Sequence, residues 1–248
     1  MHPDRDTGRR FPDTRRSVVA AACSTDAGRR RWAFEALAAA YWKPVYKYLR
    51  LRFQIPVEDA EDLTQGFFAG ALEKDFFARY DPAAARFRTY LRVCLDGFVA
   101  NHYKSKRRLK RGGGVHLLSL DCAGAEAELL RTQVGEPFDL EAFFHREWVR
   151  SLFGLALAAL RDDCRRSGKT VQLALFERHD LEPADDRRRP SYADLAVEFG
   201  LPITQVTNYL AFARRQFRRR VLAELRRTTG SEAEFRAEAR ELLGVDLP

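Results

Sequence analysis

The 248-residue chain has few of the residue patterns that hold metal ions or form disulfides. Its four cysteines, Cys23, Cys94, Cys122 and Cys164, lie far apart and form no Cys-x-x-Cys pair. The five histidines have no spacing that would complete a zinc site. We therefore expect free, reduced cysteines in an intracellular protein that needs no metal and no cofactor.

Long apolar runs are also missing. No stretch approaches the roughly 18 apolar residues of a membrane span, and the N-terminus, rich in Arg and Asp, has no apolar run of the signal-peptide type. No alternation of apolar and polar residues is long enough to predict a β-strand. These absences predict a cytoplasmic protein with no membrane partner and an all-α fold.

Common enzyme motifs are absent as well. The sequence contains no Gly-x-Ser-x-Gly elbow and no His-Glu-x-x-His pair. The segment 167–170, Ser-Gly-Lys-Thr, is typical of the end of a phosphate-binding loop, but that loop needs a glycine where this chain has Asp163. Such a loop also follows a strand, whereas a helix is predicted here. We therefore expect that the protein is not an enzyme.

Positive charge is in surplus. The chain has 43 Lys and Arg against 35 Asp and Glu, a net charge of +8 and an isoelectric point near 9.5. This surplus favours a polyanionic partner, with nucleic acid ahead of an anionic membrane surface. The length allows two small domains, since domains commonly hold about 100 to 150 residues.

The distribution of apolar residues divides the chain into five parts. Residues 1–28 have no apolar periodicity, which predicts a disordered arm. Residues 29–112 form a first helical domain, in which Pro44 is expected to kink or split the first helix. Residues 113–138, with glycines among small and acidic residues, predict a flexible linker. A second helical domain spans 139–228, and 229–248 hold a short amphipathic helix, with a capping box at Ser231 and Glu234, that we expect to pack on the second domain.

Residues 191–221 have the pattern of a helix-turn-helix. Ser191 and Asp194 resemble a capping box at the start of a short helix. The motif needs a small residue where its helices touch, a glycine at the turn and a branched apolar anchor, and Ala196, Gly200 and Val206 stand at these places. The second helix then presents short polar groups for base edges and arginines for phosphates. Its predicted DNA contacts are Thr204, Gln205, Thr207, Asn208, Tyr209, Ala211, Arg214 and Arg215.

Two charged segments mark the first domain. Residues 57–62 bring four carboxylates to a predicted helix start, where the helix dipole favours them. Residues 101–111 contain six cations and no acid, at the end of the third predicted helix.

Taken together, these segments resemble the extracytoplasmic-function (ECF) class of RNA polymerase sigma factors over residues 30–226. The acidic segment is similar to the family's acidic helix with its Asp-Leu-x-Gln core, which is residues 62–65 here. By this likeness Glu61, Asp62 and Gln65 contact the clamp helices of the largest polymerase subunit. The alternative is that the acids only serve the helix dipole.

Residues 87–108 resemble the family's helix that opens the promoter and reads its −10 element, together with the basic loop behind it. Opening needs cations for the displaced strand and aromatic groups for an unstacked base. The likeness gives this role to Tyr90, Asn101, Tyr103, Lys104, Lys106, Arg107 and Arg108. Tyr90 has an alternative place in the core.

The resemblance implies a nucleoid-associated sigma factor that binds core RNA polymerase, including its flap region, and directs it to promoter DNA. The helix-turn-helix would read the −35 element, and an anti-sigma regulator is a further partner that the resemblance allows. The strongest alternative is a helix-turn-helix repressor or activator that acts as a dimer without polymerase. A third possibility is an adaptor that binds no DNA.

Overall fold

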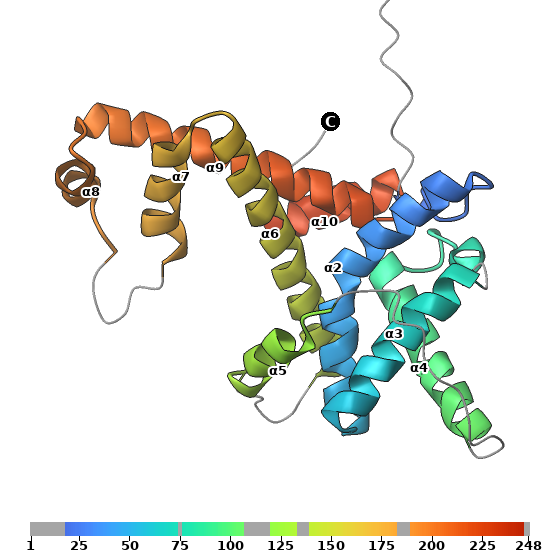
Figure 1. Cartoon of the computed structure of the whole chain (residues 1–248). Coiled ribbons are helices and arrows are strands. Elements are labelled where there is room, and N and C mark those ends of the chain that lie inside the picture. Colours follow the sequence, from blue (N-terminus) through green and yellow to red (C-terminus); the bar gives the residue numbers. More distant parts are fainter. Residues whose placement is uncertain (1–17, 74–75, 107–119, 133–138, 183–188, 246–248) are drawn as a thin grey trace, which may run out of the picture.

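The computed structural model describes residues 18–73, 76–106, 120–132, 139–182 and 189–245 (Figure 1). Within these ranges every regular element is a helix and no strand occurs, so the all-α prediction is confirmed there. None of the helices in these ranges is both long and apolar enough to cross a membrane. The elements are α1 (Val18–Ala21), α2 (Ala27–Phe53), α3 (Val57–Glu73), η1 (Phe76–Arg79), α4 (Phe87–Lys106), α5 (Cys122–Leu130), α6 (Leu140–Arg166), α7 (Thr170–Phe176), η2 (Glu177–Leu181), α8 (Tyr192–Phe199), α9 (Ile203–Thr228) and α10 (Glu232–Leu243).

The start of the described chain is packed. Val18 and Val19 of α1 are buried in the main core, and α1 contacts α2 and α9. The prediction of a disordered arm over 1–28 is therefore wrong for residues 18–28, because the apolar side chains of α1 are buried against other helices. Residues 1–17 lie outside the described ranges. Asp26 caps α2 by accepting hydrogen bonds from the amides of Gly28 and Arg29. The helix continues through Pro44 without being split.

Two long helices connect the two ends of the molecule. α6 and α9 hold 27 and 26 residues, which makes each of them about 40 Å long. The first half of α6 packs on α2, where Trp148 stacks on Tyr41 with ring centroids 6.4 Å apart. The second half of α6 packs on other helices, and Leu160 is buried together with residues of α7 and α9. One helix therefore contributes to the core at both ends.

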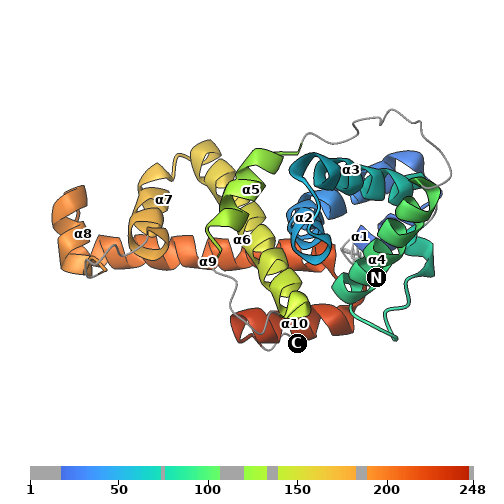
Figure 2. The ribbon, with the colours of Figure 1, turned by 90° about the horizontal axis from the view of Figure 1, so that it is seen from below.

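α9 is shared in the same way. Its first turns bury Val206 and Leu210 against α7 and α8, and its last turns bury Val221 and Leu225 in the main core. Figure 2 shows α9 extending from α8 at one end of the molecule toward α10. α6 and α9 therefore join the two halves of the described chain, because each enters the hydrophobic clusters at both ends rather than leaving the halves connected only by a tether.

α5 occupies part of the segment that was predicted as a flexible linker. Its acids face α2, where Glu126 binds Arg50 (2.6 Å) and Glu128 binds two lysines. The flexible-linker prediction is therefore wrong for 122–130, because the acids that suggested a solvated segment pair with α2. Residues 107–119 and 133–138 lie outside the described ranges, and the domain boundaries within them stay predictions.

Lys47 is fully buried, which is unusual for a lysine. Its ammonium group binds Glu128 of α5 (2.7 Å) and Glu147 of α6 (2.6 Å). Lys43, one turn earlier, binds the other oxygen of Glu128 (2.7 Å) at the edge of the cluster. A buried ammonium is stable only when carboxylates compensate its charge. This cluster therefore joins α2, α5 and α6 electrostatically.

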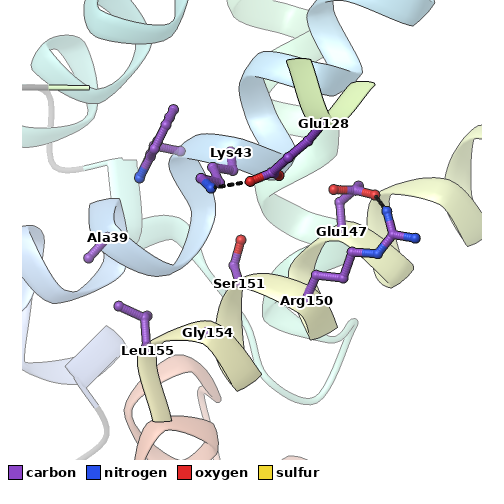
Figure 3. A pocket seen from close by; sticks show the side chains of 9 residues that line it. Ala39, Lys43, Glu128, Glu147, Arg150, Ser151, Gly154 and Leu155 are labelled. Carbon is purple, nitrogen blue, oxygen red and sulfur yellow. Dashed lines mark hydrogen bonds and ion pairs between the residues drawn. The ribbon is translucent and has the colours of Figure 1, made fainter. Parts of the chain in front are cut away.

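A pocket of about 470 Å³ opens beside these ion pairs (Figure 3). Trp42 and Leu155 supply apolar parts of its wall, and the two cations on the wall, Lys43 and Arg150, bind Glu128 and Glu147. Because both cations are already paired, they offer little attraction to an anionic ligand. The pocket lies between α2, α5 and α6.

Lys47→Met should destabilise the protein strongly, whereas Lys43→Met should not. Removing Lys47 leaves Glu147 buried, and we expect a loss of about 3 kcal/mol, the lower end of the range for a broken buried pair, since Arg150 still neutralises part of this charge. Lys43 lies at the edge, and its replacement should cost less than about 1 kcal/mol. Urea denaturation measures both. Equal losses would contradict the assignment of Lys47 to the core.

Candidate nucleic-acid interface

α8 and α9 meet at a tight turn. The Ser191 hydroxyl accepts a hydrogen bond from the Asp194 amide (3.2 Å), and the Asp194 carboxylate accepts one from the Ser191 amide (2.8 Å), so the predicted capping box is confirmed. Gly200 ends α8 in the left-handed conformation (φ 64°), which glycine adopts without strain. α9 begins after Pro202. The turn lies where the sequence predicts it.

A small core holds the two helices together. Leu195 of α8 and Val206 and Leu210 of α9 are fully buried with Leu175 of α7, and Ala196 packs against them. Ala196 and Val206, which the sequence predicts as the helix contact and the apolar anchor, both belong to this core. Their burial leaves the opposite face of the first turns of α9 in solvent.

The eight residues predicted to contact DNA divide into two groups. Three of them are held by neighbours: the Gln205 amide donates a hydrogen bond to the Tyr209 hydroxyl, Tyr209 packs against the small core, and Arg214 belongs to an internal network. The other five recur at every third or fourth residue along one face of α9, and all but the half-buried alanine are exposed. We call them the outer face: Thr204, Thr207, Asn208, Ala211 and Arg215.

Arg214 ties three elements together. Its guanidinium donates hydrogen bonds to both carboxylate oxygens of Asp180 in η2 (2.7 and 2.9 Å) and to the hydroxyl of Tyr192 in α8 (3.0 Å). Burial opposes the ionisation of Asp180, but the hydrogen bonds from Arg214 and His179 outweigh it and hold the pKa of this carboxyl below its usual value. The sequence predicts a phosphate contact for Arg214, whereas the structure uses its charge internally.

The second predicted DNA-binding group follows the last turns of α4. Three of its members are exposed there, and the Tyr103 ring is 41% exposed. They are Asn101, Tyr103 and Lys104. The side chains of the remaining cations of this group lie outside the described part of the chain, namely Lys106, Arg107 and Arg108.

Tyr90 lies apart from that group, near the start of α4. Its hydroxyl donates a hydrogen bond to the carbonyl oxygen of Phe76 (2.7 Å), and its ring lies 5.3 Å from that of Tyr80. The half-buried Tyr90 therefore fastens α4 to η1. This is the alternative role, a place in the core, that the sequence leaves open for this residue.

The outer face of α9 and the end of α4 lie at opposite ends of the structure. In both Figure 1 and Figure 2, α8 and the start of α9 are at one end and α4 is at the other. The long helices α6 and α9 lie between them. A ligand that contacts both groups at once must therefore be long, as duplex DNA is.

The three predicted polymerase contacts on α3 differ in exposure. Asp62 is exposed, whereas Glu61 and Gln65 are half-buried. The pKa of the Cys122 thiol of α5 is raised to about 11, mainly by burial and secondly by the nearby Glu61 carboxylate. α5 thus lies beside this acidic face, and Asp62 is the member of the three most open to a partner.

α10 is hydrogen bonded to the segment that leads into α4. The Glu234 carboxylate accepts hydrogen bonds from the Phe87 amide (2.8 Å) and the Tyr80 hydroxyl (3.1 Å). The Ser231 hydroxyl caps α10, but Glu234 reaches the amide of Gly230 (2.6 Å), so only half of the predicted capping box forms. The carboxylate is drawn away because it also binds α4.

Two arginines complete this contact. Arg86 binds both Glu238 (2.9 Å) and Glu241 (3.0 Å) of α10, and Arg88 binds Glu238, whose side chain is fully buried. α10 also packs on α9, as expected, but these ion pairs attach it to the first half of the chain as well. Sequence reasoning missed them because the partners are far apart in the chain.

The family model of sigma-70 region 2 matches residues 37–109. The matched range includes the later part of α2, all of α3 and all of α4, and hence both the acidic face and the exposed end of α4. No curated protein and no solved structure matches the chain. The match supports placing the chain among the sigma factors, which bind RNA polymerase and recognise and open promoters.

Arg214→Ala should lower the thermal unfolding midpoint, whereas Arg215→Ala should leave it unchanged. The first change removes one of the two arginines that bind the partly buried Asp180 carboxylate, leaving Arg189 (2.8 Å), and the second removes an exposed cation one residue further along. The effect of Arg214→Ala should shrink in acid, because the contribution of a carboxylate with a lowered pKa is present at neutral pH and is lost as the pH falls through that pKa. Calorimetry at pH 7 and pH 3 measures this. Equal midpoints for the two variants at pH 7 would contradict the network.

Proposed function

We propose that the chain is an ECF-type sigma factor that binds core RNA polymerase and directs it to promoters. The sigma-70 region 2 match is the observation that carries this proposal. In this proposal the polymerase performs the chemistry, and the chain itself is a binding protein rather than an enzyme. No membrane partner is required.

The exposed part of the acidic face would dock the polymerase. Asp62 of α3 offers a carboxylate to the clamp helices of the largest subunit, with Glu61 and Gln65 beside it. Its exposure supports a role for this side chain beyond the helix dipole, because Glu58 and Asp59 already stand in the first turn of α3. The flap region of the polymerase and an anti-sigma regulator remain further partners in this proposal.

The end of α4 would open and read the −10 element. Tyr103 presents an exposed aromatic ring on which an unstacked base can stack, and Lys104 next to it can hold a phosphate of the displaced strand. Asn101, one turn earlier, can hydrogen bond to a base edge. The exposure of these three side chains supports the assignment, and the packed Tyr90 is left out of it.

The outer face of α9 would read the −35 element as the recognition helix of a helix-turn-helix. Its residues lie in the first turns of α9, the part of such a helix that enters a major groove. Asn208 can make two hydrogen bonds to adenine, and Arg215 can bind a phosphate. The position of this face at the opposite end from α4 supports the proposal, since the two promoter elements are separate boxes on one duplex.

Asp62→Ala should weaken binding to purified bacterial core RNA polymerase by about tenfold or more, the cost of losing a charge-assisted contact. Glu58→Ala is the matched control, because it removes an exposed acid from the first turn of the same helix. A fluorescence titration of labelled chain with core enzyme measures both. If the acids only serve the helix dipole, neither change weakens binding. A wild-type chain with no affinity for core enzyme would overturn the sigma-factor proposal.

Asn208→Ala and Arg215→Ala should impair DNA binding in different ways. On a duplex that the holoenzyme selects from a random pool, Asn208→Ala should cost about 1–3 kcal/mol on the selected sequence and nothing on unrelated DNA. Arg215→Ala should weaken both equally and reduce the salt dependence of log K by about one. Gel-shift assays over a salt series separate the two effects. A stable dimer of the free chain that protects a palindrome without polymerase would favour the repressor alternative instead.

A further inference from the structure

Three potential metal ligands converge where α6 meets α10. His145 comes from α6, and Glu238 and Glu241 stand three residues apart on one face of α10. One ligating atom from each residue lies within 4.8 Å of the others. We propose that His145, Glu238 and Glu241 form a binding site for a divalent transition-metal ion of the zinc type.

Unsatisfied polar atoms point independently to a missing ligand. The Nε2 atom of His145 and the Oε2 atom of Glu238 are both buried, and no hydrogen bond within the described residues satisfies either of them. Glu238 is fully buried. A buried polar atom without a partner costs about 1–3 kcal/mol, so an occupant that binds both atoms is favoured.

The surrounding ion pairs leave the Oε2 atom of Glu238 available for the ion. Arg86 and Arg88 both bind the Oε1 atom of Glu238, and Arg86 also binds the Oε2 atom of Glu241. These guanidiniums hold the two carboxylates in fixed positions, as the hydrogen-bond partners of metal ligands do in metal sites. The two guanidiniums balance the charge of the two carboxylates, so the cluster is close to neutral before any ion binds.

Packing holds the imidazole of His145 in place. Its ring stacks on Trp148 with centroids 5.7 Å apart. A ring that is already ordered loses little freedom when its Nε2 atom binds an ion.

The donor set selects the class of ion. One imidazole nitrogen and two carboxylate oxygens suit Zn²⁺ with a water in the fourth position, whereas Mg²⁺ demands six oxygens in octahedral geometry. A tetrahedral ion with bonds of about 2.1 Å holds its ligand atoms about 3.4 Å apart. The exposed Glu241 side chain can move the short distance needed, because its outer part lies in solvent. The bound ion would fasten α6 to α10, and through Arg86 and Arg88 to the start of α4.

The test uses the full-length chain, stripped of metal with a chelator, and Zn²⁺ alone, so its outcome does not depend on the proposed function. Calorimetric titration should find one tight Zn²⁺ site, and Mg²⁺ should not compete for it. Glu241→Gln and His145→Gln should each weaken Zn²⁺ binding by at least the roughly 10- to 100-fold that is lost when a hydrogen-bond partner of a metal ligand is removed. Glu232→Gln is the matched control, since it removes an exposed acid from the same helix outside the cluster.

Thermal unfolding gives a second readout if a variant is less stable. Zn²⁺ at a concentration that just saturates the wild type should raise the unfolding midpoint of the wild type and of Glu232→Gln, and should raise that of Glu241→Gln much less. The exposed thiol of Cys23 is the main competing ligand, so the titration is repeated with Cys23→Ser. The proposal is overturned if titration of the wild type shows no saturable Zn²⁺ binding, which is the result expected if the site holds only water. It is equally overturned if binding survives both cluster variants or disappears with Cys23→Ser.

Discussion

The fold depends on the burial of α6 and α9 at both of their ends. Each helix is too long to be covered by one bundle, so its apolar residues pack on α2 at one end and on α7 and its neighbours at the other. The stacked rings of Tyr41 and Trp148 and the buried hydrogen bond from the Tyr41 hydroxyl to the Thr228 carbonyl oxygen (3.2 Å) join the first half of the chain to the second. This constraint sets the positions of the two exposed groups, because it holds the end of α4 and the start of α9 apart.

Apolar periodicity predicted the parts of the fold in which a helix buries a single face. The inward residues of α9, the capping box of Ser191 and the turn at Gly200 are of this kind, because each depends on neighbours within a few residues. The sequence could not reveal burial on a second face. α2 is covered by α3 on one side and by α5 and α6 on the other, so even Lys47 is buried, and the acids of α5 that bind α2 looked like those of a solvated linker.

The same limit applies to the candidate site. The sequence identified the helix that carries the outer face, but it could not separate Arg215, which is exposed, from Arg214, whose partner Asp180 lies on another element. The sequence left the role of Tyr90 open for the same reason, because the hydrogen bond that holds its hydroxyl goes to Phe76 on another element. His145 and the glutamates of α10 offered no recognisable metal spacing, since a site built from distant helices leaves no local pattern. The residues left exposed in each group form a smaller and more coherent set than the sequence alone suggested.

In this account an acidic helix binds the polymerase, while exposed groups at the two ends of the structure, held apart by α6 and α9, contact separate promoter elements. The most direct measurement is run-off transcription by purified core RNA polymerase on a promoter library, with start sites mapped in the presence and absence of the chain. The account predicts that adding the chain creates defined start sites downstream of a common pair of sequence elements. Start sites that are the same with and without the chain would contradict it.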